Sequence, residues 1–191
     1  MKKLLILLWP CLISACSTIA TGGAEITGLS LLHDRRTGEA LMKDEQIEIK
    51  AALELNASDD IRDRAHFNVT AYNGIVLITG EAPDAALRDK MLEKVRVIPN
   101  VKMVHNEVVI APPSSYSSRS ADTLITTKVK SALSNIRDLP GFDATRVKVV
   151  TENGVVYLLG LLHQTEAKAA GEQVRSVKGV KKVVKVFEVI E

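Results

Sequence analysis

The chain has 191 residues, a length that fits one domain or two small ones. Hydrophobic residues make up 46% of it and charged residues 25%, which excludes a disordered chain, a collagen-like chain and a multi-pass membrane protein. The formal net charge is only +2, and we expect no nucleic-acid partner.

Residues 1–15 have the pattern of a secretory signal peptide. Lys2 and Lys3 precede an apolar run, which is shorter than the roughly 20 residues that a membrane-spanning helix needs. The ending Ile13-Ser14-Ala15-Cys16 is similar to the lipobox of bacterial lipoproteins. This resemblance implies that Cys16 is acylated after cleavage and anchors the chain in a membrane. The alternative is a plain secretory signal with a chance cysteine.

Acylation of Cys16 leads to further expectations. Cys11 leaves with the signal and Cys16 becomes a thioether, so no thiol remains for a disulfide, a metal site or a nucleophile. Without Lys2 and Lys3, the 25 basic residues fall to 23, which equals the 23 acidic ones. In bacterial lipoproteins, an aspartate directly after the acylated cysteine favours retention in the inner membrane. This chain has Ser17 at that position, so the same resemblance implies a lipid anchor on the periplasmic face of the outer membrane.

Beyond the anchor the sequence repeats itself. We interpret residues 16–43 as a flexible, glycine-containing tether. At an offset of about 80 residues, Asn73-Gly74 and the apolar run after it match Asn153-Gly154 and its apolar run. We therefore place one copy at residues 44–110 and a second at 120–191, joined by a Pro- and Ser-rich linker at 111–119.

Each copy is predicted to run helix, strand, strand, helix, strand. Asn-Gly between β-branched runs is a strong hairpin signal, because both turn residues need positive φ, and it predicts hairpins over 67–80 and 147–160. Apolar residues at helical spacing predict the second helices over 84–97 and 165–178. The predicted fold class is α+β: two tandem small α-β-β-α-β domains, each a three-stranded mixed sheet packed on two helices.

This element order, the Asn-Gly hairpin, the glycine at the end of the next strand and the closing run Gly179-Val180-Lys181-Lys182-Val183-Val184 resemble the BON domain. Two copies behind a lipobox resemble the outer-membrane lipoproteins of that family. The resemblance implies binding of an anionic phospholipid membrane through the second domain and support of outer-membrane integrity. It also implies an effect on the outer-membrane β-barrel assembly machinery, which no residue pattern indicates.

No residues form a catalytic or metal-binding pattern, so we expect neither an enzyme, a cofactor nor a metal site. The histidines lie far apart in the sequence, with no i, i+4 pair: His33, His66, His105 and His163. A cluster of carboxylates lies in a predicted polar loop beside arginines and lacks the calcium-loop pattern: Asp59, Asp60 and Asp63.

The two copies differ in charge and in the outer faces of their first helices. Residues 44–110 carry 8 basic and 12 acidic residues, whereas residues 120–191 carry 11 basic and 8 acidic ones. A basic module beside an acidic one, on a membrane-tethered chain, indicates different partners for each. The alternative is drift in surface charge.

In the second copy, helical spacing places Ile125 on the core-facing stripe and Leu124 on the outer face with Lys128. An exposed leucine one turn before a lysine suits insertion among lipid headgroups, although a single exposed leucine also occurs without any function. The expected phospholipid-binding residues are Leu124, Ile125, Thr126, Lys128 and Lys130, with Lys168 and Arg175 as weaker candidates.

In the first copy, Ile49 and Leu53 point away from the core stripe, which indicates contact with the other domain or with another protein, or a helix that is more deeply buried. The leading hypothesis is therefore a phospholipid-binding lipoprotein. The alternative is a protein-interaction adaptor of the envelope that uses Ile49 and Leu53, with lipid binding incidental.

Overall fold

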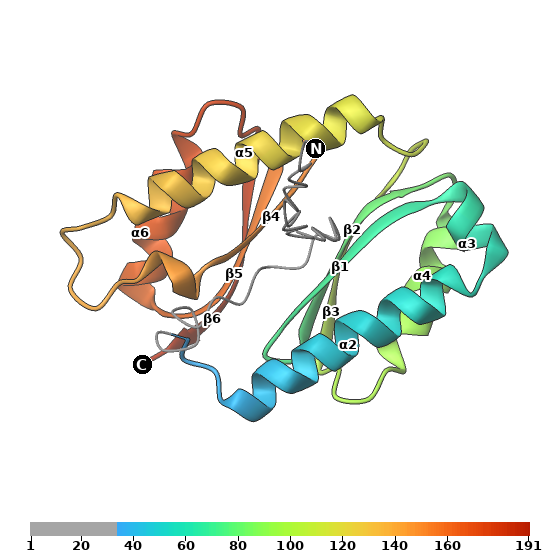
Figure 1. The fold of residues 1–191 in the computed structure, drawn as a ribbon, viewed down its shortest axis with the longest axis horizontal. Coiled ribbons are helices and arrows are strands. Elements are labelled where there is room, and N and C mark those ends of the chain that lie inside the picture. The colour runs from blue at the N-terminus through green and yellow to red at the C-terminus, as the bar shows by residue number, and fades with distance from the viewer. Residues whose placement is uncertain (1–33) are drawn as a thin grey trace, which may run out of the picture.

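A computed structural model describes residues 34–191, which form two domains in succession along the chain (Figure 1). The predicted signal segment, the lipidation site Cys16 and His33 lie outside the described residues. None of the described helices is both long enough and apolar enough to cross a membrane.

Both domains have the predicted order of elements. The first domain contains α2 (Gly38–Asn56), α3 (Asp59–Arg64), β1 (His66–Tyr72), β2 (Ile75–Ala82), α4 (Ala85–Arg96) and β3 (Met103–Ile110). The second contains α5 (Tyr116–Ser134), the 3-10 helix η1 (Ala144–Arg146), β4 (Lys148–Glu152), β5 (Val155–His163), α6 (Gln164–Arg175) and β6 (Lys182–Ile190). The α+β class and the α-β-β-α-β order are thus confirmed, with α3 and η1 added.

Each sheet is mixed, as predicted. The strand order is β1-β2-β3 in one domain and β4-β5-β6 in the other. In each, the first two strands pair antiparallel and the last two pair parallel. Asn73 and Asn153 both have a φ of 51°, and the glycines that follow also have positive φ, as the Asn-Gly hairpin turns require.

One face of each sheet packs against the helices of its own domain. In the first domain Val76 and Ile78 of β2 meet Ile47, Ala51 and Leu55 of α2, all buried in one apolar core. Val156 and Leu158 of β5 do the same in the second domain, against Ile125, Val129 and Leu133 of α5. The apolar stripes of the two long helices therefore face the cores that the sequence predicts.

The other face of each sheet packs against the sheet of the other domain. A third apolar cluster combines both domains, with members Tyr72, Leu77, Val150, Tyr157, Leu159 and Val186. Figure 1 shows the result as four layers: the two sheets lie in the middle, with α2 and α4 outside one and α5 and α6 outside the other. The domains thus share a core.

Two helix starts differ from the predicted boundaries. The tether was expected to reach residue 43, but α2 begins at Gly38, because the Thr37 hydroxyl accepts a hydrogen bond from the Ala40 N–H at 3.1 Å and caps the helix. The linker was expected to reach residue 119, but Ser115 caps α5 in the same way, so that helix begins at Tyr116. Local caps, rather than apolar periodicity, decide both starts.

The carboxylate cluster does not lie in a loop, as expected, but in the short helix α3. Asp59 and Asp60 occupy its first turn, where carboxylates are favoured by the helix dipole, and Arg62 and Arg64 occupy its last turn. The pairs Arg62–Asp59 and Arg64–Asp60 are 2.8 and 3.0 Å long. The cluster is therefore balanced by its own arginines.

Candidate membrane-binding surface and domain interface

The outer face of α5 carries the central residues of the predicted lipid site. Leu124 is 63% exposed despite its apolar side chain, and Lys128 and Lys130 are also exposed. Lys128 lies one turn after Leu124 on the same side of the helix, whereas Lys130 is turned by about 120° from it. Leu124 and Lys128 thus form one surface, which we call the α5 outer face, and Lys130 lies outside it, on the other side of the helix.

Two of the predicted lipid residues point inward. Ile125 is buried in the core of the second domain, as expected for a neighbour on the core stripe. Thr126 is half-buried, and its hydroxyl donates a hydrogen bond of 2.8 Å to the Thr151 hydroxyl on β4. Thr126 therefore does not share the α5 outer face with Leu124. Lys168 and Arg175 are exposed on α6, which packs beside α5.

Charge distinguishes the two long helices. Helix α5 has three basic residues and one acidic residue, Asp122, which is buried. Helix α2 has two basic and five acidic residues. Ile49 and Leu53 of α2 are 52% and 67% exposed, so the predicted second apolar face exists, but it lies on a helix that an anionic surface would repel.

A buried aspartate near the start of each long helix holds the hairpin turn of the same domain. Asp122 accepts hydrogen bonds from the backbone N–H groups of Asn153 and Gly154, at 2.9 and 2.8 Å. In the first domain, the Asp44 carboxylate accepts the equivalent hydrogen bonds from the backbone N–H groups of Asn73 and Gly74, at 2.6 and 2.8 Å. These bonds fix α5 against its sheet, so the direction in which Leu124 points is set by the fold.

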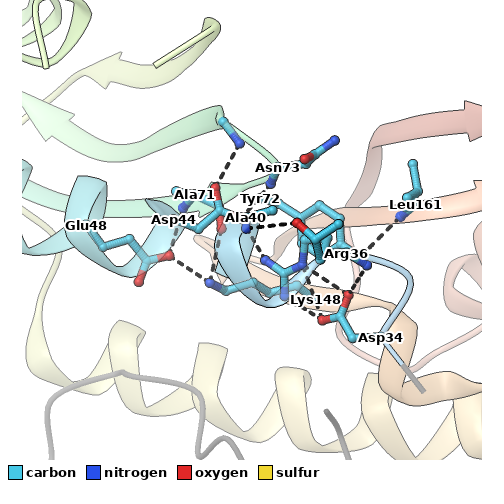
Figure 2. Close-up of polar contacts among 12 residues, drawn as sticks. Asp34, Arg36, Ala40, Asp44, Glu48, Ala71, Tyr72, Asn73, Lys148 and Leu161 are labelled. Carbon is cyan, nitrogen blue, oxygen red and sulfur yellow. Dashed lines mark hydrogen bonds and ion pairs between the residues drawn. The ribbon is translucent and has the colours of Figure 1, made fainter. Parts of the chain in front are cut away.

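Polar bonds at the rim of the interface join the two domains. Figure 2 shows Lys148 of β4 reaching Glu48 of α2, with 2.7 Å between Nζ and Oε1. The same Oε1 atom accepts a bond of 2.7 Å from the backbone N–H of Ala71. The backbone N–H of Leu161 donates to the Tyr72 hydroxyl at 3.3 Å. These bonds hold one sheet in register against the other.

The segment before α2 contacts both domains. Arg36 stacks on the ring of Tyr72 at 3.9 Å and pairs with Asp34 and Asp44 in the first domain (Figure 2). Arg35 turns to the second domain, where it pairs with the buried Glu166 of α6. Residues 34–36, assigned to the tether from the sequence, are therefore part of the domain interface.

No partner of His66 could be predicted from the sequence, but the fold places two carboxylates beside it. Its Nδ1 lies 3.1 Å from Glu81 Oε2 in the neighbouring strand and 3.8 Å from Glu152 Oε1 in the second domain. Burial, then the charges of Glu81 and Asp122, raise the pKa of Glu152 to about 7. Burial and the nearby Arg119 lower the pKa of His66. Only the packing of the two sheets brings these groups together.

Two helix-covered, three-stranded mixed sheets, each with the α-β-β-α-β order, define a class of small tandem α+β domains. The model of the BON domain matches residues 43–112 and 121–191, so the chain belongs to the BON-domain family and contains two such domains.

Two relatives match most of the chain. It is 33% identical over 193 residues to the outer membrane lipoprotein DolP of Haemophilus influenzae, covering 100% of this chain and 97% of the relative. It is 35% identical over 158 residues to a 21 kDa hemolysin of Actinobacillus pleuropneumoniae, covering 83% and 80%. Among solved structures, the C-terminal domain of CdsD, a structural protein of the type III secretion system of Chlamydia trachomatis, matches with 12% identity and a TM-score of 0.30, covering 78% of this chain and 67% of that one.

Proposed function

We propose that the protein is a non-enzymatic lipoprotein, anchored through Cys16 on the periplasmic face of the outer membrane. There its second BON domain binds anionic phospholipid and supports outer-membrane integrity. The observation that carries the proposal is the α5 outer face, where a 63% exposed leucine lies one turn from an exposed lysine. The full-length similarity to an outer membrane lipoprotein supports the location.

The energetics indicate a weak contact that depends on the anchor. Burying the Leu124 side chain contributes about 1.5–3 kcal/mol, and each lysine near an anionic surface adds about 1 kcal/mol. Such a sum gives dissociation constants of about 1 mM or weaker for the unanchored body. An acylated Cys16 raises the local lipid concentration, because the second contact then becomes intramolecular.

The length of chain before the domains allows this contact. Eighteen steps separate Cys16 from Asp34, where the described residues begin, and an extended chain covers at most about 3.3–3.6 Å per residue. The reach is therefore up to about 60 Å. That distance exceeds the diameter of a small domain, about 30 Å, so the α5 outer face can be presented to the membrane that holds the anchor.

The test is co-sedimentation of the unacylated chain, residues 17–191, with vesicles at several millimolar lipid. We expect binding to anionic vesicles and none to zwitterionic ones, and we expect Leu124→Asp with Lys128→Glu to abolish it. The matched control is Leu53→Asp with Lys50→Glu on α2, where Leu53 is equally exposed at 67%. Equal loss in both double variants, or no binding by the folded wild type, contradicts the proposal.

A second candidate function rests on the exposed face of α2. Met42, Ile49 and Leu53 are 66%, 52% and 67% exposed, and their spacing places them within about 40° on one side of the helix. Such a stripe suits a protein partner, for which the outer-membrane β-barrel assembly machinery is the candidate, with lipid binding incidental.

One comparison of variants distinguishes lipid binding from the adaptor function. Ile49→Gln with Leu53→Gln removes the α2 stripe and leaves α5 untouched. If this variant binds anionic vesicles normally but fails to restore envelope integrity in cells lacking the protein, the adaptor function is the better account. If it restores integrity while the Leu124 and Lys128 double variant does not, lipid binding is the function.

A further inference from the structure

Three possible metal ligands from both domains meet at one end of the interface. His66 opens β1 and Glu81 lies directly opposite it in the β1–β2 ladder, whereas Glu152 is the last residue of β4. One ligand atom from each residue lies within 4.8 Å of the other two. Tetrahedral ligands at the usual Zn²⁺ bond length of about 2.0–2.1 Å are separated by about 3.3 Å, so small shifts suffice to surround an ion.

The hydrogen bonds of the cluster leave it incompletely satisfied. The Glu81 carboxylate accepts bonds from the Ser114 N–H, the Asn153 amide and His66. Glu152, by contrast, is only 7% exposed, and its one ion-pair contact among residues 34–191 is with His66, at 3.8 Å. A carboxylate this deeply buried whose one ion-pair contact is long is costly for the fold.

A fourth polar group, the hydroxyl of Thr79, lies beside this cluster. The Thr79 hydroxyl is fully buried and makes no hydrogen bond of ordinary length and angle among the described residues. It lies next to the Glu152 carboxylate, whose pKa its weak hydrogen bond lowers. Buried hydroxyls are almost always bonded, and a water on a bound ion would give this one a partner.

The local charge favours a dication. The charges of Glu81 and Asp122 both act on the Glu152 carboxylate, and the nearby cation Arg119 offsets them only in part. With all four groups ionised the excess is two negative charges. Two carboxylates from different domains repel each other across the interface unless a cation lies between them.

We propose that His66, Glu81 and Glu152 bind one divalent transition-metal ion, with Zn²⁺ as the best fit, and that this ion joins the two BON domains. The imidazole selects against Ca²⁺ and Mg²⁺, which prefer oxygen ligands in larger numbers. Three protein ligands leave one position for water. His66 would bind through the Nδ1 lone pair and carry its proton on Nε2, so the metal replaces the His66–Glu81 hydrogen bond.

The test is calorimetric titration of residues 17–191, freed of metal, with ZnCl₂. We expect one Zn²⁺ per chain, no heat with CaCl₂ or MgCl₂ at the same concentration, and a higher melting temperature with Zn²⁺. His66→Gln and Glu152→Gln should each weaken binding by at least about tenfold. The matched control is His105→Gln, a half-buried histidine in β3 of the same sheet, which should bind like the wild type.

A second readout covers variants that fold poorly. In ¹⁵N-histidine spectra of the wild type, Zn²⁺ should shift the Nδ1 resonance of His66 and leave that of His105 unchanged. Absence of stoichiometric binding, equal binding by the His66 and His105 variants, or an unshifted His66 Nδ1 would overturn the proposal. Vesicle binding by His66→Gln is expected to be normal, so this test does not depend on the lipid-binding proposal.

Discussion

The guanidinium of Arg35 and the carboxylate of Glu166 form a two-point ion pair, although 131 residues separate them in the sequence. Arg35 also donates to the Leu161 carbonyl at 3.0 Å. Because Arg35 precedes the first domain and Glu166 lies in the second, this pair ties the start of the described chain to α6. It therefore fixes where the chain leaves the body towards Cys16.

Loss of this pair is expected to destabilise the second domain. Arg35→Ala removes the two-point partner of the Glu166 carboxylate, whose side chain is 3% exposed, and leaves it the longer ion-pair contact of 3.7 Å with Arg146. We expect the free energy of unfolding to fall by about 2 kcal/mol. Urea denaturation followed by circular dichroism measures this. Arg62→Ala removes a pair whose side chains are largely exposed and should give no measurable change. Equal effects of the two substitutions would contradict the importance of the Arg35 contact.

The same pair predicts a pH dependence. Burial raises the pKa of Glu166, but hydrogen bonds from Arg35 and from the His163 N–H outweigh it and hold the pKa below its ordinary value of 4.5. The charged form is thus favoured in the fold, so its stabilising contribution is present above about pH 4.5 and is lost as the pH falls through the lowered pKa. Glu166→Gln should lower the melting temperature at neutral pH, with the difference shrinking below pH 4. A difference that grows on acidification would refute the sign.

The shared core predicts that the two domains unfold together. Leu77 is completely buried in the cluster between the sheets, so Leu77→Asp places a charge there and should separate the domains. Domains of this size bury only about 60% of their unfolded surface, so each alone is marginally stable. Calorimetry should show one transition for the wild type and, for the variant, two transitions or one at a much lower temperature. Leu53→Asp, on the exposed face of α2, should melt like the wild type.

Gly80 is expected to tolerate no side chain. It has a φ of +123°, and an added Cβ would lie 2.1 Å from the backbone carbonyl oxygen of His66 on the paired strand. Since backbone must move to relieve this overlap, Gly80→Ala should cost about 2–4 kcal/mol of stability by denaturant unfolding. Gly38→Ala, at the start of α2 with no atom within 4 Å of the added Cβ, is the control and should be neutral or slightly stabilising. A similar loss of stability in both variants would show that overlap with the His66 carbonyl is not the cause.

Much of the fold could be predicted because its signals are local. The Asn-Gly turns require positive φ at neighbouring residues, and α4 follows the predicted range of 84–97 within one residue at each end. Helical spacing also predicted that Leu124, Ile49 and Leu53 would be exposed. The starts of α2 and α5 were missed because each depends on one capping hydroxyl in a stretch without apolar periodicity.

The sequence did contain a signal for the packing of the two sheets. The strands β2 and β5 have continuous apolar runs rather than alternating ones, Ile75–Ile78 and Val155–Leu159, which is typical of strands buried on both faces. Read in this way, the runs indicate that something covers the second face of each sheet. They do not indicate that each domain covers the other.

The sequence by itself determined the repeat, the family, the two sheets and the faces of α2 and α5, since each depends on residues close together in the chain. The tertiary structure alone decided the pairing of Arg35 with Glu166 and the meeting of His66, Glu81 and Glu152. Arg35 precedes the first domain and Glu166 lies in the second, and His66 and Glu152 lie in different domains. Periodicity carries no information about such contacts, because they depend on how two completed sheets fit against each other.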